Sequence, residues 1–192
     1  MTGAGARRLV LASRSPQRRA ILEQLGIPFT VRATDVVEVD AGPPDAVASE
    51  NALRKALAVA GDEDGVVLGV DTVVATGADL WGKPPDAQAA RETLRRLSGR
   101  THRVVGGVAV VAGETVRHAF TATTQVTFRA LDDRLLDWYV AAGEWEDRAG
   151  GYAIQGRGAA LVTAIAGDYL NVVGLPVAAL LDAWPELLAL GA

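Results

Sequence analysis

Short apolar runs alternate along this chain with longer stretches whose apolar residues recur at helical spacing. Residues 9–12 and 66–70 have the length and composition of buried strands, whereas 46–60 and 86–97 have the pattern of helices. This alternation is typical of a sheet with helices packed on it. We therefore predict an α/β or α+β fold built around a mixed sheet.

The pattern changes in the second half of the chain. Between 101 and 128 the segments GGVAVV and TTQVTF predict two antiparallel strands. A helix at 132–142, the glycine-rich bend AGGYAIQGRGA, a strand at 160–165 and a last helix opened by GLP follow. Because no repeat, low-complexity tract or Pro/Ser-rich linker divides the chain, we predict one domain over 1–192.

The bulk composition excludes several classes of function. A chain of 192 residues, 49% of them hydrophobic, can bury a substantial core. The net charge of -4 argues against a dedicated nucleic-acid binder. The absence of cysteine excludes disulfides, thiolate zinc sites and a cysteine nucleophile, and two histidines do not suffice for a histidine-rich metal site.

No part of the chain has the pattern of a membrane or export segment. The paired Arg7 and Arg8 precede only a short apolar run, and no stretch reaches the ~20 apolar residues of a membrane span. We therefore expect a cytoplasmic protein without a membrane partner.

The stretch LVLASRSPQRR joins a strand candidate directly to a helix start. Pro16 is favoured at the first helical position, and Ser15 is a suitable N-cap. Free N–H groups, the positive end of the helix dipole and the Arg18 guanidinium would then lie close together, which favours anion binding. An ordinary turn with surface arginines is the alternative. The Gly-x4-Gly-Lys-Ser/Thr pattern of a P-loop is missing, which disfavours a Walker-type NTPase.

Further charged residues stand beside predicted turns and element ends. Asp71 follows a β-branched strand, where a carboxylate is costly to bury without a cation or a hydrogen-bonding task. Lys83 lies in a Gly-Lys-Pro turn, Lys55 in an apolar helical stretch and Glu38 in a loop. Together with Arg18 they supply the charges needed to bind a triphosphate and a divalent metal. A capping aspartate and solvated lysines are the alternatives.

Eight segments also occur in the order and at the spacing of a known family. They are LASRSPQRRAIL, the loop acid Glu38, NALRKA, GVDTV, GKP, LSGRTHRVVGGVAV, AGGYAIQGRGA and GDYLNVVGLP. Over nearly its entire length the chain resembles the Maf family of nucleoside triphosphate pyrophosphatases. Single motifs of this kind are weak, but their ordered combination is specific.

The resemblance implies a fold, a reaction and a set of partners. The fold is a mixed sheet with two lobes around a central cleft, similar to inosine triphosphate pyrophosphatases, usually as a homodimer. The reaction converts a nucleoside triphosphate and water to the monophosphate and pyrophosphate, with Mg or Mn as the divalent cofactor. No nucleic-acid partner is implied.

The resemblance also assigns roles to individual residues. Asp71 is implied to be the proton acceptor and, with Glu38, a metal ligand, whereas Lys55 and Lys83 are implied catalytic cations. The positions implied to bind substrate are Ser13, Ser15, Gln17, Arg18, Arg19, Thr72 and Gln155.

The base preference stays open at this point. Thr72 and Gln155 match positions that separate dTTP/UTP-type members from members acting on methylated guanine nucleotides. Gln17, however, occupies the first arginine position of the SPRR pattern typical of the dTTP/UTP type. Arg148 replaces a usual lysine, which keeps the charge but exchanges an ammonium for a planar fork.

Two other classes of function are compatible with these residues. A phosphatase or nucleotidyltransferase would share the phosphate-binding cations. Maf proteins are also associated with septum inhibition and cell-division arrest, so a nucleotide-binding regulator is possible. We favour the enzyme because a sensor has no obvious use for an acid placed like Asp71.

Four more residues have weaker assignments. We expect His102 and His118 on the β segments as surface or cross-strand residues. Tyr152, near Gln155 in the glycine-rich bend, could help to read a base edge. Asp168 could be a turn residue or part of the metal shell.

Overall fold

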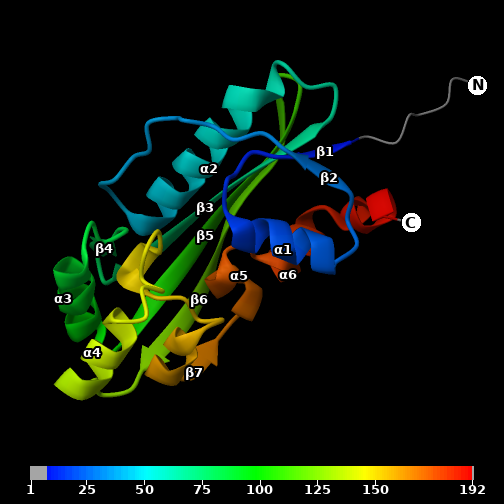
Figure 1. The fold of residues 1–192 in the computed structure, drawn as a ribbon. Coiled ribbons are helices and arrows are strands. Elements are labelled where there is room, and N and C mark those ends of the chain that lie inside the picture. Colours follow the sequence, from blue (N-terminus) through cyan, green and yellow to red (C-terminus); the bar gives the residue numbers. More distant parts are fainter. Residues whose placement is uncertain (1–7, 192) are drawn as a thin grey trace, which may run out of the picture.

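A seven-stranded mixed sheet forms the centre of the computed structural model, which describes residues 8–191 (Figure 1). The order is β2-β1-β3-β5-β6-β7, with β4 paired to β3. β1 is parallel to β2 and β3, whereas all other pairs in the described chain are antiparallel. The strands are β1 (Leu9–Leu11), β2 (Phe29–Val31), β3 (Val66–Thr76), β4 (Asp79–Trp81), β5 (Thr101–Ala112), β6 (Thr115–Phe128) and β7 (Val162–Ala166).

Helices cover both faces of this sheet. Side-chain caps begin several of them: Ser15 accepts from the Arg18 N–H, Asp86 from Ala89 and Asp132 from Leu135. The helices are α1 (Pro16–Gln24), α2 (Pro44–Ala60), α3 (Ala87–Leu97), α4 (Asp133–Val140), α5 (Tyr169–Val173) and α6 (Val177–Ala183), with 3-10 turns η1 (Ala149–Gly151), η2 (Arg157–Leu161) and η3 (Pro185–Gly191).

Helix α2 packs closely on β3 and β5 because glycines face it. A Cβ atom on Gly69 would lie 2.2 Å from the Ala52 carbonyl oxygen, and one on Gly107 would lie 2.0 Å from that of Ala48. Both alanines are fully buried. The close approach brings Lys55, one turn further along α2, against the middle of β3.

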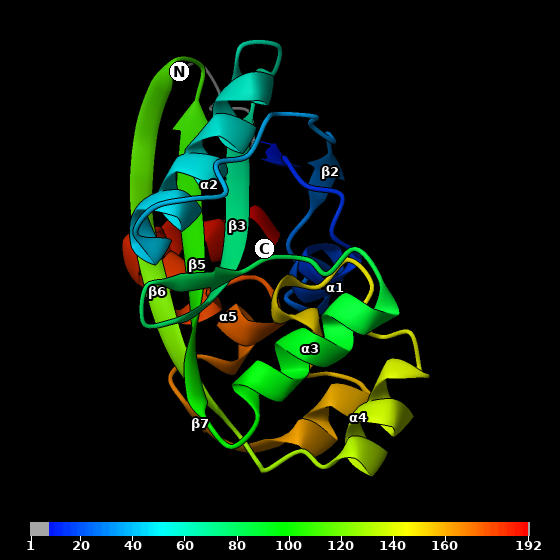
Figure 2. The same cartoon turned by 90° about the vertical axis from the view of Figure 1, so that its left-hand side faces the viewer.

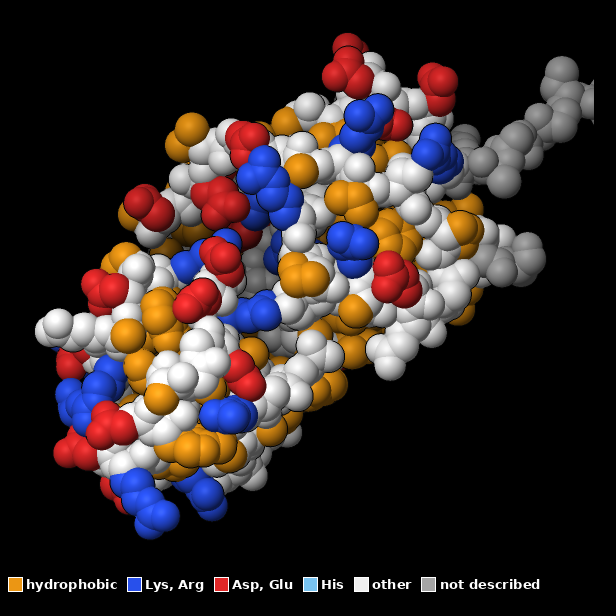
Figure 3. Space-filling view, viewed as in Figure 1, with side chains coloured by type: hydrophobic (Ala, Val, Ile, Leu, Met, Phe, Trp, Pro, Cys, Tyr) orange, Lys and Arg blue, Asp and Glu red, His pale blue; other side chains and the backbone are white. Residues whose placement is uncertain are grey.

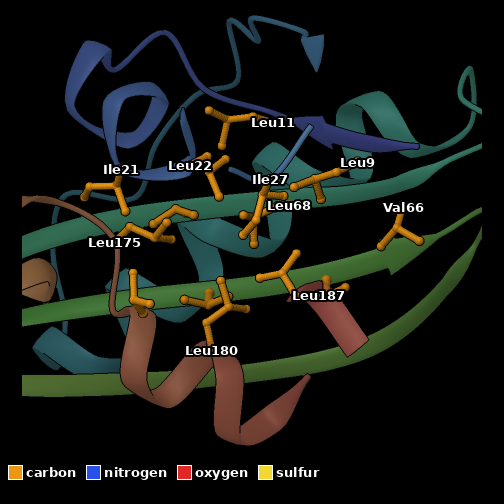
Figure 4. Packing of buried hydrophobic residues seen from close by; sticks show 14 residues of the cluster. Leu9, Leu11, Ile21, Leu22, Ile27, Val66, Leu68, Leu175, Leu180 and Leu187 are labelled. Atoms are coloured by element: carbon orange, nitrogen blue, oxygen red, sulfur yellow. The ribbon is translucent and has the colours of Figure 1, made fainter. Parts of the chain in front are cut away.

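The opposite face of the sheet carries the main apolar core (Figure 4). Leu9, Leu11 and Leu68 of β1 and β3 pack against Leu22 of α1 and Leu180 of α6. All five are at most 1% exposed. This packing fixes α1 beside the end of β1, so the loop between them has a defined position.

A second core lies at the far ends of the long strands, under α3 and α4 (Figure 2). It contains Leu94 of α3, Tyr139 of α4, and Phe128 and Tyr152, whose rings meet edge to face at 4.8 Å. The molecule therefore has two packed regions joined by β3, β5 and β6.

The predicted fold class is confirmed: a mixed sheet with flanking helices. Several elements differ from prediction, and β3 and α5 show why. β3 continues to Thr76 although the sequence predicted its end at Val70, because the acid Asp71 interrupts an apolar run without ending the strand. α5 was not predicted, because five residues are too few to show helical periodicity.

The described chain contains no helix long and apolar enough to cross a membrane. Residues 1–7 and 192 lie outside the described residues, so the prediction that the N-terminus is not a targeting segment falls largely outside them.

Candidate functional site

The loop between β1 and α1 folds back on itself through its serines. The Ser13 hydroxyl accepts hydrogen bonds from the Ser15 N–H at 3.2 Å and from the Arg18 Nη1 at 2.9 Å. Ser15 caps the helix by accepting from the Arg18 N–H at 3.5 Å. The start of a nine-residue helix, with its positive dipole end, therefore lies beside a guanidinium, as an anion site requires.

Arg18 is held rigidly in the interior, with only 8% of its surface exposed. Its Nε donates to the Gly174 carbonyl at 2.9 Å and its Nη2 to the Thr72 hydroxyl at 3.1 Å. Burial lowers the pKa of the Arg18 guanidinium, while the charges of Asp71 and Glu38 raise it. Because arginine stays protonated in proteins, this side chain is a fixed positive charge facing two carboxylates.

One ammonium joins the two acids singled out in the sequence. Lys55 Nζ lies 2.6 Å from Asp71 Oδ1 and 2.7 Å from Glu38 Oε1. The Lys55 and Asp71 side chains are only 11% and 10% exposed, whereas Glu38 is 51% exposed. Gly107 is the strand neighbour of Asp71 on β5 and has no side chain, so α2 can reach the carboxylate. The result is a buried carboxylate whose charge is balanced by a lysine.

A residue without a predicted role completes this cluster. Asn51, one helical turn before Lys55 on α2, donates from Nδ2 to Asp71 Oδ2 at 3.3 Å. The signal in the sequence is an asparagine four residues before a lysine, inside an alanine-rich helix where asparagine is a poor helix former. Spacing alone indicates a shared helix face but not the bonding partner.

Two of the predicted site residues stand apart from the cluster. Lys83 follows β4 and is 62% exposed, and its nearest acid is Asp147 at 3.8 Å. Within residues 8–191 no ion pair joins Lys83 to Asp71 or Glu38. Gln155 lies exposed in the turn before η2. The structure thus brings Lys55, but not Lys83 or Gln155, into contact with Asp71.

The remaining predicted substrate residues surround the start of α1. Gln17 Oε1 accepts from the Ser15 hydroxyl at 3.1 Å, which ties its amide to the helix cap. Arg19 is exposed. Figure 3 shows a hollow on this face between α1, α2 and the segment around η1, with Lys, Arg, Asp and Glu side chains gathered around it. An open, charged groove of this kind suits an elongated anion.

A comparison with known protein families identifies the family to which this chain belongs. The model of the family described as "Maf-like protein" matches residues 8–187, which is nearly the whole chain. The chain belongs to the Maf family. Its resemblance to this family, inferred from eight ordered motifs, is thereby confirmed.

Curated members of the Maf family are closely similar to this chain. A protein of Moorella thermoacetica named dTTP/UTP pyrophosphatase is 51% identical over 177 residues, covering 88% of this chain and 90% of its own. One of Symbiobacterium thermophilum with the same name is 48% identical over 174 residues, covering 88% of each chain. The solved structure of a HAM1 protein from Coxiella burnetii has a TM-score of 0.47 and 16% identity, covering 81% of this chain and 91% of its own.

Glu38 and Asp71 are the two acids of this Maf-family chain that could bind a divalent cation. Glu38 and Asp71 already share one cation, the Lys55 ammonium. No group of three or more metal-binding side chains was found within residues 8–191. Mg²⁺ commonly binds one or two carboxylates together with substrate phosphates, rather than an all-protein cage. The donor set therefore fits an ion that arrives with a phosphorylated ligand.

Some predictions about this Maf-family chain were wrong in detail, whereas others were confirmed. Asp71 lies inside β3 rather than at its end. His102 is the cross-strand residue that was one of the two alternatives, paired with Val126 on β6, and not the surface residue: it is 1% exposed, and its Nε2 lies 2.9 Å from the Tyr152 hydroxyl. That bond occupies Tyr152, which is 6% exposed and so does not present its hydroxyl to a base. For Asp168, predicted as a turn residue or part of the metal shell, the structure agrees with the first alternative: it caps α5 by accepting from the Leu170 N–H at 2.8 Å.

Proposed function

We propose that this protein hydrolyses a nucleoside triphosphate to the monophosphate and pyrophosphate. The observation that carries the proposal is the position of Asp71: a buried carboxylate bonded to Lys55 at 2.6 Å, next to Thr72, whose hydroxyl accepts from Arg18 at 3.1 Å. The name that curated relatives share, dTTP/UTP pyrophosphatase, supports the same reaction. A phosphate-binding regulator would need the cations alone.

The cations would offset the charge of the triphosphate. A triphosphate carries about four negative charges, which repel an approaching water until cations and N–H groups spread that charge. Arg18 and the start of α1 would provide a fixed part of this field. Lys55 and the exposed Lys83 would provide the rest, because a free ammonium can turn toward a phosphate oxygen.

Asp71 would accept the proton of the attacking water. Its oxygens are held by Lys55 and Asn51, and each carboxylate oxygen keeps a further lone pair for a water. As the water oxygen bonds to the α-phosphorus, the bond from that phosphorus to the bridging oxygen breaks. The electron pair leaves with pyrophosphate and the water proton passes to Asp71. No covalent enzyme intermediate is required.

Glu38 and Asp71 would hold a divalent cation, Mg²⁺ or Mn²⁺. When bound, such an ion neutralises phosphate charge and makes a bound water more acidic. Lys55, which bridges the two acids at 2.6 and 2.7 Å, would then be released toward the phosphates.

We infer dTTP and UTP as the preferred substrates, since curated relatives carry those nucleotides in their names. Thr72 and Gln155 match the pattern of that type, and Gln17 departs from it. A homodimer acting in the cytoplasm is part of the same proposal and rests on the family resemblance. A separate role in septum formation stays a hypothesis from that resemblance.

A substrate panel tests the proposal. Canonical and modified nucleoside triphosphates are incubated with the protein and Mg²⁺, Mn²⁺ or a chelator, and pyrophosphate and monophosphate are quantified. We expect equal amounts of the two products, dependence on metal, and preference for dTTP and UTP. Release of orthophosphate, or binding without turnover, would reject the pyrophosphatase. A Gln17→Arg variant tests whether this position changes the ranking of bases.

A further inference from the structure

Asn51 is a buried polar residue in the middle of α2. It is 2% exposed, although an amide in an apolar environment is costly unless its hydrogen bonds are made. Asparagine also lowers helix stability relative to the alanines around it. A residue with both penalties is expected to have a task that those neighbours cannot perform.

The Asn51 amide binds both polar groups of one loop residue. Its Oδ1 accepts from the Val39 N–H at 2.7 Å, and its Nδ2 donates to the Val39 carbonyl at 2.9 Å. Val39 follows Glu38 in a segment without regular secondary structure. The side-chain amide therefore acts on this loop as a neighbouring strand would, and it fixes the backbone beside Glu38.

The same Nδ2 also reaches the carboxylate on the sheet, at 3.3 Å from Asp71 Oδ2. One amide thus contacts the loop that carries Glu38 and the strand that carries Asp71. Lys55, one turn later on α2, bridges the same two acids through their charges. Lys55 would exchange its partners for phosphates, whereas Asn51 has no charge and can keep its bonds.

We propose that Asn51 is a positioning residue that sets the distance and orientation of Glu38 and Asp71 toward a shared divalent cation. This inference rests on the proposed function, because it assigns Asn51 to the metal-binding acids of that site. Residues behind metal ligands typically change metal affinity or activity by about 10–100-fold when they are replaced.

Two near-isosteric variants separate positioning from simple packing. Asn51→Leu has a similar shape and favours the helix, but it removes the side-chain hydrogen bonds to Val39 and Asp71. Glu38 and Asp71 are then no longer held by one shared residue. Asn51→Asp keeps an acceptor for the Val39 N–H and adds a third negative charge beside the pair. We expect kcat to fall about tenfold or more in both variants, with the KM for the nucleotide changed less than about threefold.

Binding of Mn²⁺ to the protein saturated with a non-hydrolysable triphosphate analogue provides the second measurement, by electron paramagnetic resonance of the free ion. Asn51→Leu should weaken Mn²⁺ binding about tenfold, whereas Asn51→Asp should tighten it, because added ligand charge favours a cation. Ala58→Asp, which places the same charge on the exposed face of α2, should leave both kcat and the affinity for Mn²⁺ unchanged. Structural damage alone would move the affinities of the two Asn51 variants in the same direction.

The outcomes distinguish this inference from the proposed function. If the unaltered protein releases no pyrophosphate, the proposed function fails. If it is active, but folded Asn51→Leu keeps its kcat, or both variants change Mn²⁺ affinity in the same direction, only the positioning role fails.

Discussion

The groove has α2 on one side and the segment around η1 on the other, where the Gly150 N–H donates to the Gly82 carbonyl beside Lys83, and these two sides hold their lysines in opposite ways. On the α2 side, Lys55 and Asp71 are only 11% and 10% exposed and lie 2.6 Å apart. On the β4 side, Lys83 and Asp147 are 62% and 93% exposed and lie 3.8 Å apart. Lys55 thus belongs to a buried, hydrogen-bonded cluster, whereas Lys83 is solvent-exposed and only loosely paired with Asp147.

This difference indicates that Lys55 and Asp71 are positioned before substrate binds, whereas Lys83 can still change its position on binding. Breaking one partner of a buried ion pair is costly, because a charge is left without compensation. An exposed pair contributes about 0–1 kcal/mol, so either member can change partner easily. We infer that the α2 side keeps its geometry without substrate, whereas Lys83 takes up its working position only when phosphates are present.

The largest effect is expected from breaking the organised side at Asp71. Asp71→Asn keeps the size of the side chain but removes the proton acceptor, so kcat should fall about 10²–10⁴-fold. Nucleotide affinity, measured by calorimetry with a non-hydrolysable analogue, should be retained, because the cations remain. Asp79→Asn, at an exposed position of β4, is the matched control. Near-normal turnover of folded Asp71→Asn would remove this residue from the mechanism.

The free energies of unfolding of two lysine variants test whether the two sides of the groove differ. Lys55→Met leaves the buried Asp71 without its ion-pair partner and should lower the free energy of unfolding by about 3 kcal/mol. Lys83→Met should change it by less than about 0.5 kcal/mol, since that ammonium is largely in water. Urea denaturation measures both. Equal losses in the two variants would contradict the division of the groove into an organised and a free side.

The sequence predicted the organised side better than the free side. Asp71, Lys55 and Glu38 were singled out as charged residues beside apolar elements, and the structure places them together. The state of Lys83 was not predictable, because a Gly-Lys-Pro turn does not say where an ammonium points. Asn51 was missed because its partner Val39 belongs to a loop without a periodic pattern.

The same limit applies to the fold. The strands and capped helices that periodicity predicts are present, whereas α5 and the far half of β3 depend on tertiary packing. For His102 the sequence left a surface and a cross-strand position open, and the structure has the cross-strand one, opposite Val126. The His102 ring on β5 faces Phe128 and Tyr152, at ring-centroid distances of 4.8 and 5.4 Å. Aromatic neighbours from distant segments are not visible in the local pattern.

This aromatic cluster makes the stability of the folded protein sensitive to acid. Burial lowers the pKa of His102 to about 4, against about 6.5 in an unfolded chain. Between these values the unfolded state binds the proton and the folded state does not. Stability is therefore complete above about pH 6.5 and is lost as the pH falls toward 4, by about 2 kcal/mol at pH 5.

Urea denaturation at pH 7.5 and pH 5 measures this loss. His102→Gln retains a polar partner for Tyr152 but cannot take up a proton, so its stability should change by about 2 kcal/mol less between the two pH values. His118→Gln is the control, because His118 lies outside the aromatic cluster, and it should behave like the unaltered protein. An unchanged acid loss in His102→Gln would mean that other groups cause it.

The smallest effect is expected at Asp147, where backbone conformation and charge can be separated. It is the one non-glycine residue within 8–191 with a left-handed backbone, at φ 57. Asp147→Gly relieves about 1 kcal/mol of strain, partly offset by the greater freedom of glycine in the unfolded chain. Thermal denaturation should therefore show a Tm higher by about 1–2 °C. Asp147→Asn keeps the backbone conformation and removes only the charge, so its Tm should not change. If instead both variants lower the KM for the nucleotide by the same large factor, Asp147 restrains Lys83 and the β4 side is less free than its exposure indicates.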